Sequence, residues 1–143
     1  MIVPDVNLLI YTYDAQSQFH DDAAAWWRAC LSGREPVGLL PVVVFAFVRI
    51  CTNPRVFDYP MTPAEAAGHV RSWLAEPIAQ IVEPGADHVE RVLESLEALG
   101  TAGNLVTDAQ MAAFVIEHDD ATLHTTDPDF VRFPGLRWLN PIT

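Results

Sequence analysis

Three aspartates are the residues of this chain best suited to chemistry. Asp5 follows a short apolar run at residues 2–4 and precedes a helix-like apolar run, so its carboxylate is expected at a strand-to-helix corner. Asp108 is expected in the first turn of a helix, where the helix dipole favours a negative charge. Asp127 lies in an acidic turn that leaves a short strand. Each aspartate alone is equally a helix-start or turn residue, so only their combination indicates a site.

Carboxylates gathered at one edge of a sheet need a cation between them. At an effective dielectric of 20, each close pair would repel by roughly 4 kcal/mol. Oxygen ligands without a nearby histidine or thiol favour Mg²⁺, with Mn²⁺ as a substitute. Such an ion can generate a nucleophilic hydroxide and clamp a phosphodiester. The pattern therefore predicts metal-assisted hydrolysis.

The elements that must position these residues alternate between strand and helix patterns. Strand-like runs are expected at 2–4, 37–40, 78–82, 122–124 and 136–139. Helices are expected from 21, from Pro41, from a capping box at Thr62-Pro63-Ala64-Glu65, over 87–99 and over 105–118. This order predicts an α/β fold, a three-layer α/β/α sandwich with a mostly parallel central sheet. Ligand sites in such sheets lie beyond the carboxyl ends of the strands.

Length and charge narrow the possibilities further. The 143 residues suit one domain, expected to span 1–143. Eight basic against 19 acidic residues give a net charge of −11, and all eight are arginines. The lack of lysine excludes a Walker-type phosphate loop and Schiff-base chemistry. Non-specific nucleic-acid binding is also disfavoured, so any such role needs a local arginine, a metal ion or a basic partner.

Targeting and cysteine signals are weak. No apolar stretch reaches the roughly 20 residues of a membrane span, and the first residues lack the basic region of a secretory signal. We therefore expect a soluble, cytoplasmic protein that does not associate with membranes. Cys30 and Cys51 have neither disulfide-framework nor zinc-ligand spacing and are expected to be core thiols.

Four motifs, in this order, make the chain resemble the PIN-domain family, and closely the VapC-type ribonuclease toxins of toxin-antitoxin pairs. They are Asp5-Val6-Asn7-Leu8-Leu9, Thr52-Asn53-Pro54-Arg55-Val56-Phe57, Thr107-Asp108-Ala109 and Thr125-Thr126-Asp127-Pro128-Asp129-Phe130. The resemblance runs essentially end to end. It implies magnesium-dependent RNA cleavage, inhibition by a small VapB-type antitoxin and a homodimer. It also implies that Asp5, Asp108 and Asp127 are the metal-binding, catalytic acids.

The chain departs from the family at Ala46. Many relatives have a glutamate at this position of the middle helix, before a Phe-x-Arg that here is Phe47-Val48-Arg49. The four acids of the family's site are therefore reduced to three in this chain. Asp129 from the neighbouring loop, or water, is expected to fill the coordination sphere. The number of metal ions, one or two, depends on this position.

Several neighbouring residues are candidates for supporting roles. Asn7 either orients Asp5 or a water molecule, or simply caps the helix. Thr125 or Thr126 is expected to hydrogen-bond Asp127. Arg49 either contacts RNA phosphate or, as the favoured expectation, forms an ion pair with one of the many acids; Arg55 is a second candidate for phosphate. We expect one of Trp26 and Trp27 to lie in the core. Trp73 is expected either in the core or at a surface that binds a partner.

Two other functions remain open on the sequence. A haloacid-dehalogenase-like phosphatase would use Asp5 as a covalent nucleophile. That class needs a second aspartate two residues later, where this chain has Asn7, and a lysine that is absent. A non-catalytic PIN-like binding module is the other alternative, and it is motivated by Ala46.

Overall fold

The computed structural model describes residues 1–142, and over that range the strands form one sheet. The five strands are β1 (Ile2–Pro4), β2 (Val37–Leu39), β3 (Ala79–Ile81), β4 (Thr122–His124) and β5 (Trp138–Leu139). Their order is β3-β2-β1-β4-β5, and every pairing is parallel. In the centre, Val3 of β1 lies opposite Leu123 of β4. All carboxyl ends therefore meet at one edge of the sheet.

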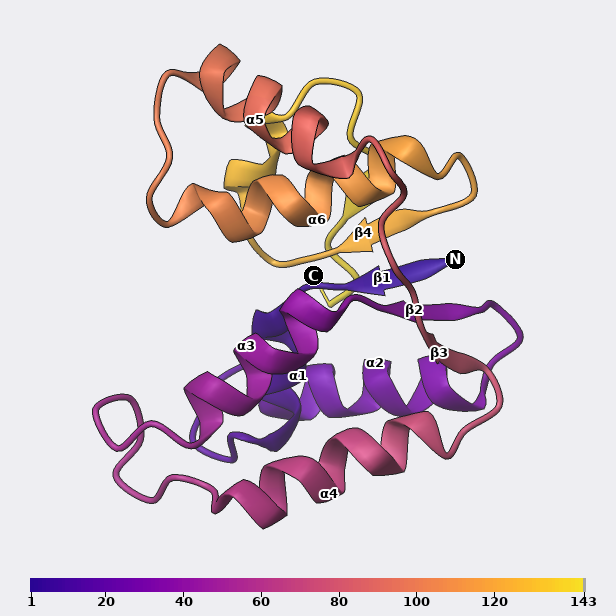
Figure 1. The fold of residues 1–143 in the computed structure, drawn as a ribbon. Helices are drawn as coiled ribbons and strands as arrows, with labels where there is room; N and C mark the ends of the chain where they lie inside the picture. Colours follow the sequence, from indigo (N-terminus) through magenta and orange to yellow (C-terminus); the bar gives the residue numbers. More distant parts are fainter. Residues whose placement is uncertain (143) are drawn as a thin grey trace.

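Helices cover both faces of this sheet, as Figure 1 shows. On one face lie α1 (Val6–Tyr13), α2 (His20–Ser32), α3 (Pro41–Cys51) and α4 (Pro63–Leu74). On the other lie α5 (His88–Leu99) and α6 (Leu105–Glu117), which pack against each other. A 3₁₀ helix, η1 (Pro128–Arg132), follows β4. The predicted three-layer α/β/α sandwich is confirmed.

Local sequence signals explain where the helices begin and end. Pro41 occupies the first turn of α3, where its missing N–H costs nothing. The capping box predicted at the start of α4 is present: the Glu65 amide donates to Thr62 Oγ1 at 3.1 Å, and the Thr62 amide donates to Glu65 Oε1 at 3.2 Å. At the end of α5, Gly100 has φ +72°, a left-handed conformation that favours glycine.

Aromatic side chains fill the core under the four-helix face. Trp73 is fully buried and packs edge-on against Phe47 and Trp27, with ring centroids 4.8 and 5.6 Å away. Its indole N–H donates to the Tyr13 hydroxyl at 2.6 Å. Trp73 is therefore a core residue, and Leu74 next to it is exposed.

The remaining expectations about packing are also met. Trp27 is buried, whereas Trp26 is half-buried and donates to His124 Nδ1 at 3.1 Å. Cys30 and Cys51 are buried free thiols, and burial raises their pKa to about 12 and about 11.

Among residues 1–142, no helix has the length and apolar character to cross a bilayer.

Candidate active site

The site lies where the order of strand addition reverses. The chain adds β2 and β3 on one side of β1, and then β4 and β5 on the other. Loops leaving two neighbouring strands diverge at such a switch point and open a crevice beyond their carboxyl ends. Asp5 directly follows β1, and Asp127 follows β4 by three residues. The two aspartates therefore flank the crevice.

Asp5 is the buried member of the group, with 3% of its surface exposed. Its backbone N–H donates to the His124 carbonyl oxygen at 2.9 Å, which continues the β1–β4 pairing past the strand end. Thr125 Oγ1 donates to Asp5 Oδ2 at 2.7 Å. Burial raises the pKa of the Asp5 carboxyl and the negative charge of Asp127 adds to the rise, while the Thr125 hydroxyl opposes it.

Asp108 lies in the first turn of α6 and is half-buried. Its pKa is raised to about 6, first by burial and then by the negative charges of Asp5 and Asp127. The guanidinium of Arg132 opposes this rise. The dependence on two other carboxylates shows that the three acids share one electrostatic environment.

Asp127 caps η1, and Thr125 ties it to Asp5. The Asp127 amide donates to Thr125 Oγ1 at 3.0 Å, and the Asp129 amide donates to Asp127 Oδ1 at 2.8 Å. The threonine hydroxyl accepts from Asp127 and donates to Asp5. The expected hydrogen bond between Thr125 and Asp127 is therefore confirmed, through the Asp127 backbone amide, while the Thr125 hydroxyl proton goes to the more buried Asp5 carboxylate.

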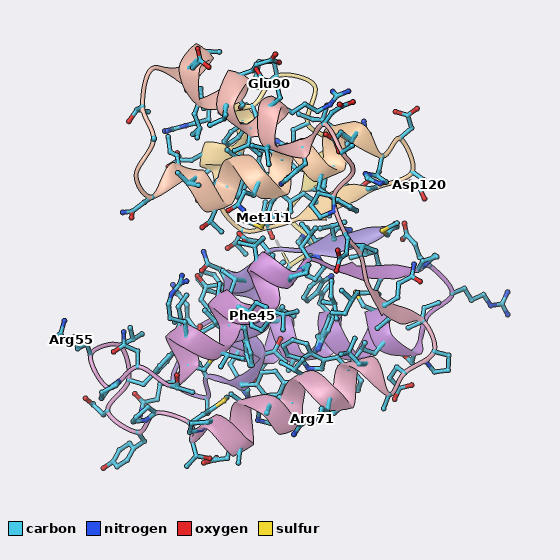
Figure 2. The ribbon with its side chains drawn as sticks, viewed as in Figure 1. Phe45, Arg55, Arg71, Glu90, Met111 and Asp120 are labelled. Carbon is cyan, nitrogen blue, oxygen red and sulfur yellow. The ribbon has the colours of Figure 1, made fainter. Side chains whose placement is uncertain are left out.

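All three aspartates line one cleft of about 280 Å³. The cleft is lined by Asp5, Val6, Asn7, Ala46, Arg49, Ile50, Gly103, Asn104, Thr107, Asp108, Met111 and Asp127. Ala46 contributes from α3, so the position of the missing glutamate does face the acids. Met111, labelled in Figure 2, contributes from α6 on the opposite side of the sheet. A second hollow, beside the end of α1, contains none of the three aspartates.

The supporting residues divide into two groups. Asn7 and Arg49 line the cleft. Asp129 does not: its side chain is 69% exposed and lies 4.0 Å from Arg132. Asp129 therefore does not line the cleft as a fourth acid, although its negative charge also raises the pKa of Asp108. Within residues 1–142 Arg49 forms no ion pair, so the favoured expectation for this residue was wrong; α3 itself contains no acid that could pair with it.

Thr107 and Asn104 are cleft residues to which the sequence motifs assigned no role of their own. Both belong to the segment that starts α6, immediately before Asp108. Gly103, also in the cleft, has φ +60° and turns the chain into that helix. Their proximity to Asp108 in the sequence was the available signal.

The oxygen atoms of the three aspartates are chemically suited to a hard cation. Their side chains are not yet close enough together to hold one. No group of three histidine, cysteine, aspartate or glutamate side chains in the described part of the chain is already close enough to hold an ion. The three aspartates offer oxygen donors only, and their mutual repulsion is opposed by little positive charge. These are the ligands that Mg²⁺ and Mn²⁺ prefer, and Mg²⁺ commonly keeps several waters beside one or two carboxylates.

Comparison with known proteins identifies the fold and the class. The PIN domain family matches residues 2–136. Ribonuclease VapC33 of Mycobacterium tuberculosis is 41% identical over 142 residues, which covers 99% of each chain. Ribonuclease VapC37 of the same organism is 38% identical, covering 99% of this chain and 97% of its own. The chain therefore belongs to the PIN-domain family.

Solved structures agree on the fold. VapC20 of M. tuberculosis, described as a sarcin-ricin-loop-cleaving toxin, superposes with a TM-score of 0.69 at 20% identity and covers 96% of this chain and 99% of its own. The VapBC2 structure from Rickettsia felis superposes with a TM-score of 0.68 at 18% identity and covers 98% of each chain. Together with the full-length sequence matches to VapC33 and VapC37, these place the chain among PIN-domain proteins of the VapC type.

Proposed function

We propose that this protein is a magnesium-dependent endoribonuclease, the toxin of a VapBC-type pair. One observation carries the proposal: three carboxylates from three separate segments line one cleft at the switch point of the sheet. The ribonuclease names of VapC33 and VapC37, which match over nearly the whole chain, support the reaction class.

Each aspartate has a distinct part in the proposed reaction. Asp5 and Asp108 would hold the cation, and Asp127 would complete the cluster or help to activate the attacking water. The bound cation supplies Lewis acidity toward the phosphodiester. Thr125 fixes Asp5 through its 2.7 Å hydrogen bond and so sets the direction of that carboxylate. Ala46 leaves room beside the three acids, so water is the remaining source of oxygen ligands on that side.

The proposed partner is a VapB-type antitoxin with basic residues. The VapBC2 structure and VapBC-1 from nontypeable Haemophilus influenzae, which covers 100% of both chains at a TM-score of 0.68, contain toxins with this fold. A net charge of −11 favours a basic partner, and basic side chains placed in the acidic cleft would exclude RNA. We also expect a homodimer, which light scattering on the purified protein measures directly.

The decisive experiment compares two substrates in the presence of magnesium, manganese or a chelator. Antitoxin-free protein is incubated with structured RNA and with a chromogenic phosphomonoester. RNA cleavage that requires the metal and is lost in Asp5→Asn supports the proposal. Hydrolysis of the phosphomonoester alone would identify a phosphatase instead. Binding of RNA without cleavage under any metal condition would identify a non-catalytic module.

A further inference from the structure

Arg49 is the only cation among the residues that line the acidic cleft. It lies in the last turn of α3, one turn after Ala46, and is exposed. It shares this cleft with three aspartates, in a chain that has 19 acidic residues and eight arginines. Nevertheless, none of the ion pairs in residues 1–142 includes it.

Two other arginines show what a structural role looks like here. Arg91 pairs with Glu117 at 3.0 Å and joins α5 to α6. Arg137 donates to the carbonyl oxygens of Val115, His118 and Ala121 and closes the end of α6. Arg49 makes no side-chain hydrogen bond or ion pair of this kind within the described residues. Its guanidinium is therefore free to bind a ligand that enters the cleft.

We propose that Arg49 binds a backbone phosphate of the RNA strand, next to the phosphate that lies over the aspartates. This rests on the proposed ribonuclease function and names a residue that positions its substrate. An acidic cleft on a protein of charge −11 repels RNA, so binding needs a cation placed at the cleft itself. A guanidinium suits this task because it donates two parallel hydrogen bonds to phosphate oxygens.

A different role for Arg49 makes different predictions. If its charge served only to lessen repulsion among the aspartates, its loss would lower the stability of the metal-free protein and change kcat. A phosphate contact formed equally in the ground state and the transition state changes KM and leaves kcat nearly unchanged. It also contributes to the salt dependence of RNA binding.

Arg55 provides a matched control. It is also exposed and also belongs to no ion pair in residues 1–142. Figure 2 shows it at the outer tip of the loop after α3, away from Met111 in the cleft. Arg55→Gln thus removes the same charge from the molecule without altering the cleft.

The test uses the full chain and a fluorescent single-stranded RNA oligonucleotide. Cleavage kinetics with magnesium are measured for the wild type, Arg49→Gln, Arg49→Lys and Arg55→Gln. We expect Arg49→Gln to raise KM roughly five- to tenfold, the effect of one charge-assisted contact at a partly exposed site, with kcat changed less than about twofold. Arg49→Lys keeps the charge and should recover part of the loss, and Arg55→Gln should match the wild type.

A binding measurement separates this inference from the proposed function. Anisotropy titrations of the same oligonucleotide in chelator, at several salt concentrations, need no catalysis. Arg49→Gln should weaken binding and reduce the slope of log K against log salt by roughly 0.7, the value for one phosphate on a single strand. If Arg49→Gln weakens RNA binding in this way but the wild type does not cleave RNA, the ribonuclease proposal is overturned and the role of Arg49 in binding stands. Equal effects of Arg49→Gln and Arg55→Gln, or a change in kcat without one in KM, would overturn the role of Arg49.

Discussion

Replacing Asp108 with asparagine should stabilise the metal-free protein, by an amount that depends on pH. The folded protein holds the pKa of Asp108 at about 6, above the ordinary 3.8 that the unfolded chain should show. Below pH 3.8 the carboxyl is protonated in both states and costs nothing. Between pH 3.8 and 6 the Asp108 carboxyl is ionised in the unfolded chain but still protonated in the folded protein, which favours unfolding. Above pH 6 it is ionised in both states, and the loss of folding free energy stays at its full value. Asparagine never ionises, so its advantage appears as pH rises.

The size of the effect follows from the same values. Each pKa unit corresponds to about 1.4 kcal/mol, so the difference between 3.8 and about 6 amounts to about 3 kcal/mol. Asp108 is only half-buried, and solvent screening reduces this to about 1–2 kcal/mol. For a domain of this size, such a change raises Tm by roughly 3–8 °C.

Melting curves in chelator at pH 4 and pH 7.5 measure the effect directly. We expect Asp108→Asn to melt above the wild type at pH 7.5 and within about 1–2 °C of it at pH 4, because each kcal/mol corresponds to a few degrees. Glu94→Gln, an exposed charge on α5, controls for the change in net charge. A lower Tm for Asp108→Asn at pH 7.5, or the same gain at both pH values, would show that burial and the neighbouring carboxylates do not raise the pKa of Asp108 in the folded protein. Saturating Mn²⁺ should reverse the order, since a ligand at 100 times its Kd stabilises the wild type by about 2.7 kcal/mol.

Three further changes test the rest of the site. Asp5→Asn should abolish RNA cleavage at equal expression while melting no lower than the wild type in chelator; retained cleavage would show that the site is wrongly assigned. Thr125→Val should cost about 1–3 kcal/mol in urea unfolding, because the Asp5 carboxylate loses a donor and the Asp127 amide an acceptor, whereas Thr125→Ser keeps both and should stay near the wild type. Ala46→Glu should lower Tm in chelator but tighten Mn²⁺ binding in calorimetric titration, with the bound ion offsetting the added repulsion. If it melts lower in both conditions and binds Mn²⁺ no better, position 46 is simply packed core.

The fold and the three aspartates could be predicted from the sequence because their signals are local. Apolar runs ending at Asp5, the helix pattern after Asn104 and the capping box at Thr62 each report on a few neighbouring residues. The rule that parallel strands end at one edge then brings the aspartates together without knowledge of side-chain positions. The described structure agrees at each of these points.

The contacts that the sequence could not predict depend on distant pairs. The hydrogen bond between Thr125 and Asp127 was predicted, but the one from Thr125 to Asp5 was not, because this partner lies 120 residues away and the sequence does not state its burial. Arg49 was expected in an ion pair because acids are abundant, but abundance does not fix the direction in which α3 points its last turn. Trp73 could not be assigned to core or surface by helical spacing alone. The Tyr13 hydroxyl that receives its N–H, far away in the chain, decides it.

The hydrogen bond between Asp5 and Thr125 also has a consequence for protein synthesis. It joins two residues 120 positions apart, one just after β1 and the other just after β4, the strand with which β1 pairs. A nascent chain that stops before β4 possesses two of the three aspartates but lacks Asp127, which lines the cleft, and Thr125, which hydrogen-bonds Asp5. Premature termination therefore yields an incomplete site. The cleft can be completed only after the loop that follows β4 has been translated.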